Sequence, residues 1–138
     1  MKNKTVFDVN IWISYFLKAR TEQIVNMIEN QNVSFFRCTE LMEELVVVLN
    51  RPKFRKYFPL GTREFILFFE LFTEFYNIVP LFTGCSDPKD NYLFDLAYQT
   101  NSKYLVSGDK KVLETPVQQS LSVLSLANFK KEIKANYI

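Results

Sequence analysis

Short, β-branched apolar segments alternate along this chain with longer segments of helical periodicity. Strands are expected at about residues 4–9, 33–36, 78–79, 103–107 and 121–125, and helices at about 11–17, 21–28, 39–49, 62–76, 90–97 and 127–135, with a helical turn at 110–114. Strands that alternate with helices form parallel sheets with helices on both faces. The prediction is therefore an α/β fold, with three α/β/α layers around a central, mostly parallel sheet of about five strands.

The composition is that of one globular domain, which we expect to span residues 1–138. Hydrophobic residues make up 48% of the chain and only three residues are glycine, so a core can form without disulfides. The two cysteines, Cys38 and Cys85, are expected to be ordinary packing or surface thiols, and a reducing cytoplasm is the expected location. No apolar run reaches the roughly 20 residues of a membrane helix.

The chain contains no histidine, which limits the chemistry that it can perform. Ser–His–Asp triads, Cys–His pairs and imidazole metal sites are all excluded. Carboxylates, lysines and hydroxyls remain. Catalysis by a hard divalent metal held by Asp and Glu oxygens is fully compatible with this composition.

Asp8 is the acidic residue that is hardest to explain structurally. It closes the first predicted strand and is flanked by apolar residues on both sides. A lone buried carboxylate costs several kcal/mol unless it is paired or bound to a metal. Because ligands bind beyond the carboxyl ends of parallel strands, Asp8 is a candidate for a site there.

Three further acids join Asp8 in the predicted site. Asp109 follows the fourth strand, Asp90 begins a helix, and Glu44 lies in the middle of a helix. Each has a simpler explanation: Asp90 as a helix N-cap, Glu44 as a solvated side chain and Asp109 as a turn residue. Together the four acids form the oxygen-rich pattern that Mg²⁺ or Mn²⁺ prefers, and such metals promote in-line displacement at phosphorus.

Four segments that contain these acids resemble, in order, the motifs of PIN domains. They are Val6-Phe7-Asp8-Val9-Asn10, Glu44-Leu45 with the residues up to Phe54, Asp87-Pro88-Lys89-Asp90-Asn91 leading to Ala97, and Tyr104-Leu105-Val106-Ser107-Gly108-Asp109-Lys110; Phe129 fits the aromatic after the last strand. The resemblance covers nearly the whole chain, and the subgroup it resembles comprises toxins of bacterial toxin–antitoxin modules.

The resemblance implies an endoribonuclease that cleaves single-stranded RNA with Mg²⁺ or Mn²⁺. Asp8, Glu44, Asp90 and Asp109 would be both the catalytic residues and the metal ligands, with Asn10 and Ser107 supporting them without binding the metal. It further implies a homodimer and a small antitoxin partner. The third ligand is open between Asp87 and Asp90, and we prefer Asp90 because it stands at the helix start, seven residues before Ala97.

The match departs from the family pattern at two positions. Val9 stands where many relatives carry Thr or Ser, and Lys111 stands where relatives often carry another Asp. These departures leave open a non-enzymatic PIN-like module that binds RNA or protein. A haloacid-dehalogenase-like phosphatase is disfavoured because Asn10 replaces its general-acid Asp, and a nucleotide-binding fold is disfavoured because neither GxGxxG nor GxxxxGK occurs.

The charge outside the four acids favours a polyanionic substrate. Without these four acids, 17 basic and 11 acidic residues give a net charge of +6. A cluster within residues 51–56 is predicted to bind RNA phosphates, together with one residue beside Asp109; these are Arg51, Lys53, Arg55, Lys56 and Lys110. A solvated surface is the alternative for all of them.

Overall fold

The central sheet contains five parallel strands in the order β3-β2-β1-β4-β5 within residues 2–136, which the computed structural model describes. The strands are β1 (Asn3–Phe7), β2 (Val33–Arg37), β3 (Thr73–Phe75), β4 (Tyr104–Val106) and β5 (Ser122–Leu124). The first strand of the chain therefore lies in the middle of the sheet. The predicted parallel α/β sheet is confirmed.

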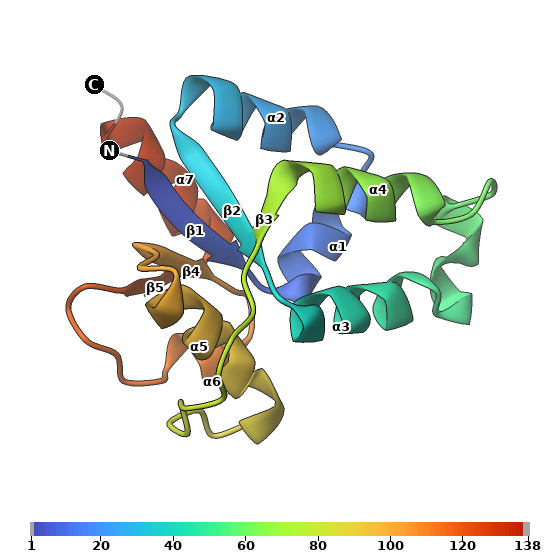
Figure 1. Ribbon diagram of the computed structural model, residues 1–138. Helices are drawn as coiled ribbons and strands as arrows, with labels where there is room; N and C mark the ends of the chain where they lie inside the picture. The colour runs from blue at the N-terminus through green and yellow to red at the C-terminus, as the bar shows by residue number, and fades with distance from the viewer. Residues whose placement is uncertain (1, 137–138) are drawn as a thin grey trace.

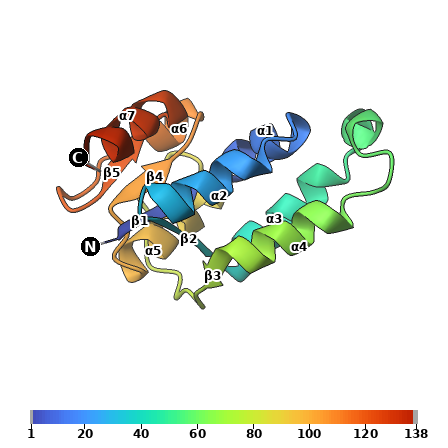
Figure 2. The same cartoon turned by 90° about the horizontal axis from the view of Figure 1, so that it is seen from above.

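Helices cover both faces of this sheet and give the predicted three layers. On one face lie α1 (Val9–Leu17), α2 (Thr21–Asn30) and α7 (Leu126–Asn136), and on the other lies α5 (Asn91–Gln99) (Figure 2). The short helices η2 (Pro88–Asp90) and α6 (Lys110–Leu113) precede α5 and follow β4. None of the helices within residues 2–136 is long and apolar enough to cross a lipid bilayer.

Residues 39–72 form an arm of helices that extends away from the sheet (Figure 1). The arm consists of α3 (Thr39–Leu49), the 3-10 helix η1 (Pro52–Tyr57) and α4 (Arg63–Phe72). Pro52 both ends the α3 pattern and begins η1, because proline lacks an N–H but fits the first turn of a helix. The outer end of the arm therefore carries η1.

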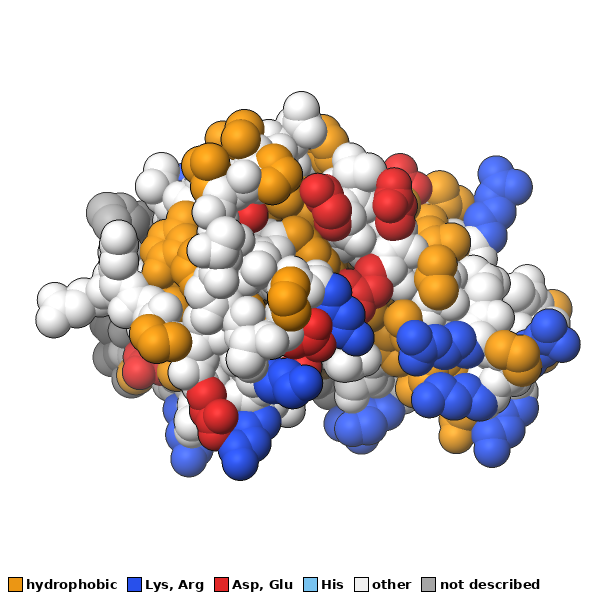
Figure 3. All heavy atoms as spheres, turned by 90° about the horizontal axis from the view of Figure 1, so that it is seen from below, with side chains coloured by type: hydrophobic (Ala, Val, Ile, Leu, Met, Phe, Trp, Pro, Cys, Tyr) orange, Lys and Arg blue, Asp and Glu red, His pale blue; other side chains and the backbone are white. Residues whose placement is uncertain are grey.

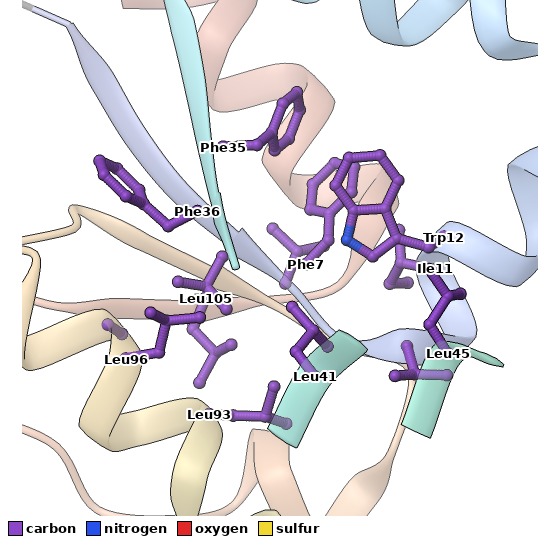
Figure 4. Packing of buried hydrophobic residues seen from close by; sticks show 14 of the residues in the cluster. Phe7, Ile11, Trp12, Phe35, Phe36, Leu41, Leu45, Leu93, Leu96 and Leu105 are labelled. Atoms are coloured by element: carbon purple, nitrogen blue, oxygen red, sulfur yellow. The ribbon is translucent and has the colours of Figure 1, made fainter. Parts of the chain in front are cut away.

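The core is rich in aromatic side chains, as the composition indicates. Phe7 packs against Phe35 and Trp12, with ring centroids 4.6 and 5.4 Å apart, and Trp12 in turn meets Phe69 of α4 at 5.1 Å. Phe36 points to the opposite side of β2 from Phe35 (Figure 4), and both residues are buried. This packing fixes β1 and its neighbours, and with them the position of the residue that follows β1.

The expected helix at 62–76 and the expected strand at 78–79 are wrong in their boundaries. The helix ends at Phe72, and the third strand is Thr73–Phe75. Arg37 of β2 donates hydrogen bonds to the carbonyl oxygens of Glu70 and Thr73, and Thr73 pairs with Phe35 in the sheet. These long-range contacts override the helical spacing of the phenylalanines. Residues 76–87 follow without helix or strand.

The strand order places a topological switch point at the carboxyl ends of β1 and β4. The chain proceeds from β1 to β2 and β3 on one side, then crosses to β4 and β5 on the other. Phe7 pairs with Val106, so these two strands end level with each other. Such switch points are where open parallel sheets bind ligands.

Candidate active site

Asp8 lies at the end of β1 with its side chain buried. It occupies the N-cap position of α1, and its backbone N–H donates to the carbonyl of Val106 at 2.9 Å. Its carboxylate does not cap the helix. It accepts a hydrogen bond from the Ser107 hydroxyl at 2.7 Å, and only 5% of the residue is exposed. The expectation of a buried carboxylate at this position is confirmed.

Ser107 and Asp109 follow β4, the strand that pairs with β1. The Ser107 oxygen accepts from the backbone N–H of Asp109 at 3.0 Å while donating to Asp8. Asp109 is the N-cap of α6, where its Oδ1 accepts from the N–H of Lys111 at 2.9 Å. Asp109 therefore caps a short helix, where the sequence suggested a turn residue as the alternative, and the cap engages one oxygen of the carboxylate.

Glu44 and Asp90 approach the ends of β1 and β4 from two helices, α3 and α5. Glu44 is half-buried on α3, and its Oε2 accepts a 2.5 Å hydrogen bond from the hydroxyl of Tyr92 on α5. Asp90 is 5% exposed and stands at the N-cap position of α5, but its side chain makes no capping hydrogen bond. No hydrogen bond therefore supports the explanation of Asp90 as a helix N-cap.

Asp87 has different surroundings from Asp90. Its Oδ1 accepts from the Lys89 N–H at 3.4 Å, and its Oδ2 forms an ion pair with Lys89 Nζ at 3.8 Å. Asp95 accepts hydrogen bonds from the N–H groups of Leu81 and Phe82. Asp95 therefore fastens the segment after β3 to α5.

The four candidate acids influence one another electrostatically. Burial raises the pKa of Asp8; the hydrogen bond from Ser107 opposes this, and the charges of Glu44 and Asp109 raise it further. The pKa of Asp90 is raised to about 6, first by burial and then by the negative charges of Asp8, Asp87, Glu44 and Asp109, in that order. The structure thus brings Asp8, Glu44, Asp90 and Asp109 into one electrostatic neighbourhood.

The donors in this neighbourhood fit a hard cation by their chemistry. All are carboxylate oxygens, which Mg²⁺ and Mn²⁺ prefer, and a cation would relieve their mutual repulsion. Among residues 2–136, no three Asp, Glu or Cys side chains stand close enough to hold one ion jointly. Mg²⁺ usually keeps several waters and takes only one or two carboxylates directly, so a partly hydrated ion does not need three of them as direct ligands.

The other predicted residues lie at the surface. Asn10 is exposed on α1, and Lys110 is exposed and pairs with Glu114 at 3.7 Å. In the view of Figure 3, acidic side chains and a basic one lie around the middle of this face, and further basic side chains gather at one end and along the margin. The predicted RNA-binding cluster is exposed at the outer end of the arm, in or beside η1: Arg51, Lys53, Arg55 and Lys56.

Tyr92 is the site residue that sequence reasoning missed. Its hydroxyl reaches Glu44 across 48 positions of sequence, and no local pattern connects the two residues. Burial and the hydrogen bond to Glu44 both raise the pKa of Tyr92, so the phenol remains protonated and available as a donor.

The sequence model of the PIN-domain family matches residues 4–111. The chain belongs to the PIN-domain family. The matched region includes all four candidate acids and ends within α6, before β5 and α7. PIN domains are typically nucleases, generally use divalent metal ions and bind RNA. A comparison with curated proteins gives no match.

Proposed function

We propose that this PIN domain is a metal-dependent endoribonuclease that cleaves single-stranded RNA. The observation that carries the proposal is the coupling of two buried acids, Asp8 and Asp90, with Glu44 and Asp109 beside the ends of β1 and β4. Gathering carboxylates in a partly buried place costs free energy that a bound cation offsets. Groups perturbed in this way are characteristic of functional sites.

Each acid has a defined part in the proposed site. Asp8, Glu44, Asp90 and Asp109 would hold Mg²⁺ or Mn²⁺, directly or through bound water, and the ion would supply Lewis-acid chemistry for in-line displacement at phosphorus. Asp90 is preferred to Asp87 because Lys89 already pairs with Asp87. Ser107 keeps the carboxylate of Asp8 in one orientation.

The preference for single strands follows from where the acids lie. A phosphodiester must come within direct reach of a recessed carboxylate cluster, which a flexible strand can do and a stiff duplex cannot. The exposed basic residues of η1 lie beyond the end of α3, the helix that carries Glu44. They would bind phosphates that flank the scissile bond, and Lys110 beside Asp109 would bind closer to it.

The test is cleavage of matched single- and double-stranded oligoribonucleotides with Mg²⁺ or Mn²⁺. Wild-type protein should cut the single strand only, and EDTA should stop the reaction. Asp8→Asn is the control for contaminating nuclease. Equal cutting by the variant, or cutting that survives EDTA, would remove the case for this site.

We further propose that the nuclease is the cytoplasmic toxin of a toxin–antitoxin module, with a small antitoxin protein as its partner and a homodimer as its assembly. The motif resemblance supports the module. Exposed leucines on the outer side of α4, Leu67 and Leu71, together with Phe75 of β3, support the dimer. Coexpression with the reading frame that precedes the gene tests the partner, since an antitoxin should restore growth.

A catalytically impaired RNA-binding module is the second candidate. The spacing of the acids favours it, since no three within residues 2–136 are grouped for joint coordination. Lys111, at a position where relatives often carry an acid, also supports the impaired module. RNA binding without cleavage at saturating Mn²⁺ would favour this candidate over the nuclease.

A further inference from the structure

Three of the four candidate acids are each held through one oxygen by a hydrogen-bond donor. Ser107 donates to Oδ2 of Asp8, the Lys111 N–H donates to Oδ1 of Asp109, and Tyr92 donates to Oε2 of Glu44. The Tyr92 contact differs from the others in its origin. It joins two helices, α5 and α3, whereas the Ser107 contact joins the ends of two paired strands and the Lys111 contact is local.

Glu44 needs such a contact more than the other acids do. Asp8 directly follows β1 and Asp109 comes three residues after β4, and the pairing of these two strands fixes both backbones. Glu44 instead lies on α3, in the arm that extends away from the sheet (Figure 1). A glutamate also has one more rotatable bond than an aspartate, so ordering its carboxylate costs more conformational entropy.

We propose that Tyr92 is a positioning residue for metal binding, which holds Glu44 by one carboxylate oxygen and presents the other to the ion. The inference rests on the proposed function, since it takes Glu44 as a metal ligand. Within residues 2–136 no side chain donates to Oε1 of Glu44, so that oxygen faces no competing donor there. Hydrogen bonds to ligating carboxylates orient them and tune their affinity.

The experiment is a calorimetric titration of the full chain with Mn²⁺ alone. Tyr92→Phe keeps the ring and removes only the hydroxyl, so we expect about tenfold weaker Mn²⁺ affinity with the fold retained. Tyr98→Phe is the matched control on the same helix, because the Tyr98 hydroxyl accepts from the Gln118 N–H instead of contacting an acid. Its Mn²⁺ affinity should equal that of the wild type.

A double-mutant cycle separates positioning from general support of the fold. If Tyr92 acts through Glu44, then Tyr92→Phe should change Mn²⁺ affinity by less than twofold in a Glu44→Ala background. In the cleavage assay, raising Mn²⁺ to saturation should restore most of the activity of Tyr92→Phe without a change in KM for RNA. A direct role of Tyr92 in holding RNA would instead raise KM at every Mn²⁺ concentration.

The possible results distinguish the positioning role of Tyr92 from the proposed metal site on which it rests. Wild-type affinity or tighter binding in Tyr92→Phe would overturn the positioning role alone, as would an undiminished effect in the Glu44→Ala background. Absence of saturable Mn²⁺ binding by the wild-type protein would overturn both the positioning role and the metal site. Melting temperatures of each variant without metal show whether a loss of affinity comes from unfolding.

Discussion

The hydroxyl of Ser107 lies 2.7 Å from Oδ2 of Asp8 and joins the end of β4 to the end of β1. The same oxygen accepts from the Asp109 N–H at 3.0 Å, so one side chain connects two candidate acids. The contact stabilises the ionised form of Asp8, since the hydrogen bond lowers a pKa that burial raises.

Ser107→Ala should therefore raise the pKa of Asp8 further and weaken Mn²⁺ binding about tenfold. NMR titration of the Asp8 carboxyl and calorimetry measure the two effects. Ser125→Ala, which removes a hydroxyl at the start of α7, is the matched control and should change neither. An unchanged Asp8 titration in Ser107→Ala would contradict the role given to this hydroxyl.

The metal-free protein should lose stability as the pH rises from about 4 to about 6. The pKa of Asp90 is raised from 3.8 to about 6 on folding, so the folded state binds more protons than the unfolded state in this window. The stabilising contribution is present below pH 4 and is lost above pH 6. The loss is at most about 3 kcal/mol, because one pKa unit corresponds to about 1.4 kcal/mol.

Asp90→Asn should flatten this pH dependence and stabilise the metal-free protein at pH 7. Urea unfolding at several pH values in the presence of EDTA provides the measurement. Glu43→Gln, an exposed position on α3, should keep the wild-type slope. A wild-type slope in Asp90→Asn would show that the buried carboxyl at this position does not cause it.

Asp95→Ala should destabilise the fold by about 2–4 kcal/mol without changing Mn²⁺ affinity. Asp95 is 4% exposed and accepts from two backbone N–H groups, which the substitution would leave without their acceptor. Urea unfolding and Mn²⁺ titration test the two halves of the prediction. A large loss of Mn²⁺ affinity in a folded Asp95→Ala protein would assign Asp95 to the site instead.

Arg55→Ala with Lys56→Ala should weaken RNA binding across sequences and leave the cleaved bond unchanged. Loss of two phosphate contacts should also reduce the salt dependence of binding by roughly one unit of slope or more. Fluorescence anisotropy at several salt concentrations measures both. Lys131→Ala with Lys134→Ala removes the same charge from exposed positions of α7 and should have a much smaller effect.

Leu67→Ser with Leu71→Ser should convert the proposed dimer to a folded monomer. Both leucines are exposed on the outer side of α4, and their removal from water would contribute apolar area to an interface. Sedimentation at micromolar concentration determines the mass. Leu60→Ser, at the tip of the arm, makes the same change in polarity and should leave the dimer intact.

The sequence was sufficient to predict the layers, and it named four candidate acids whose roles stay predictions. Local patterns placed strands at about residues 4–9 and 103–107, and the structure ends them at Phe7 and Val106. The rule that ligands bind beyond strand ends predicted that Asp8 and Asp109 lie at the same edge of the sheet. The aromatic continuation of α4 was misleading, because the contact that draws Thr73 into the sheet comes from Arg37, 36 residues earlier. Tyr92 was missed for a similar reason, since its partner lies on another helix.

The central position of β1 has a consequence for the synthesis of the protein. The strand that leads to Asp8 leaves the ribosome before the other four strands of the sheet, and its neighbour β4 follows about a hundred residues later. Until then the β4 side of β1 has no partner, and Ser107 and Asp109 do not yet exist. A nascent chain therefore carries no complete acidic cluster, and the site forms only when the sheet closes around its oldest strand.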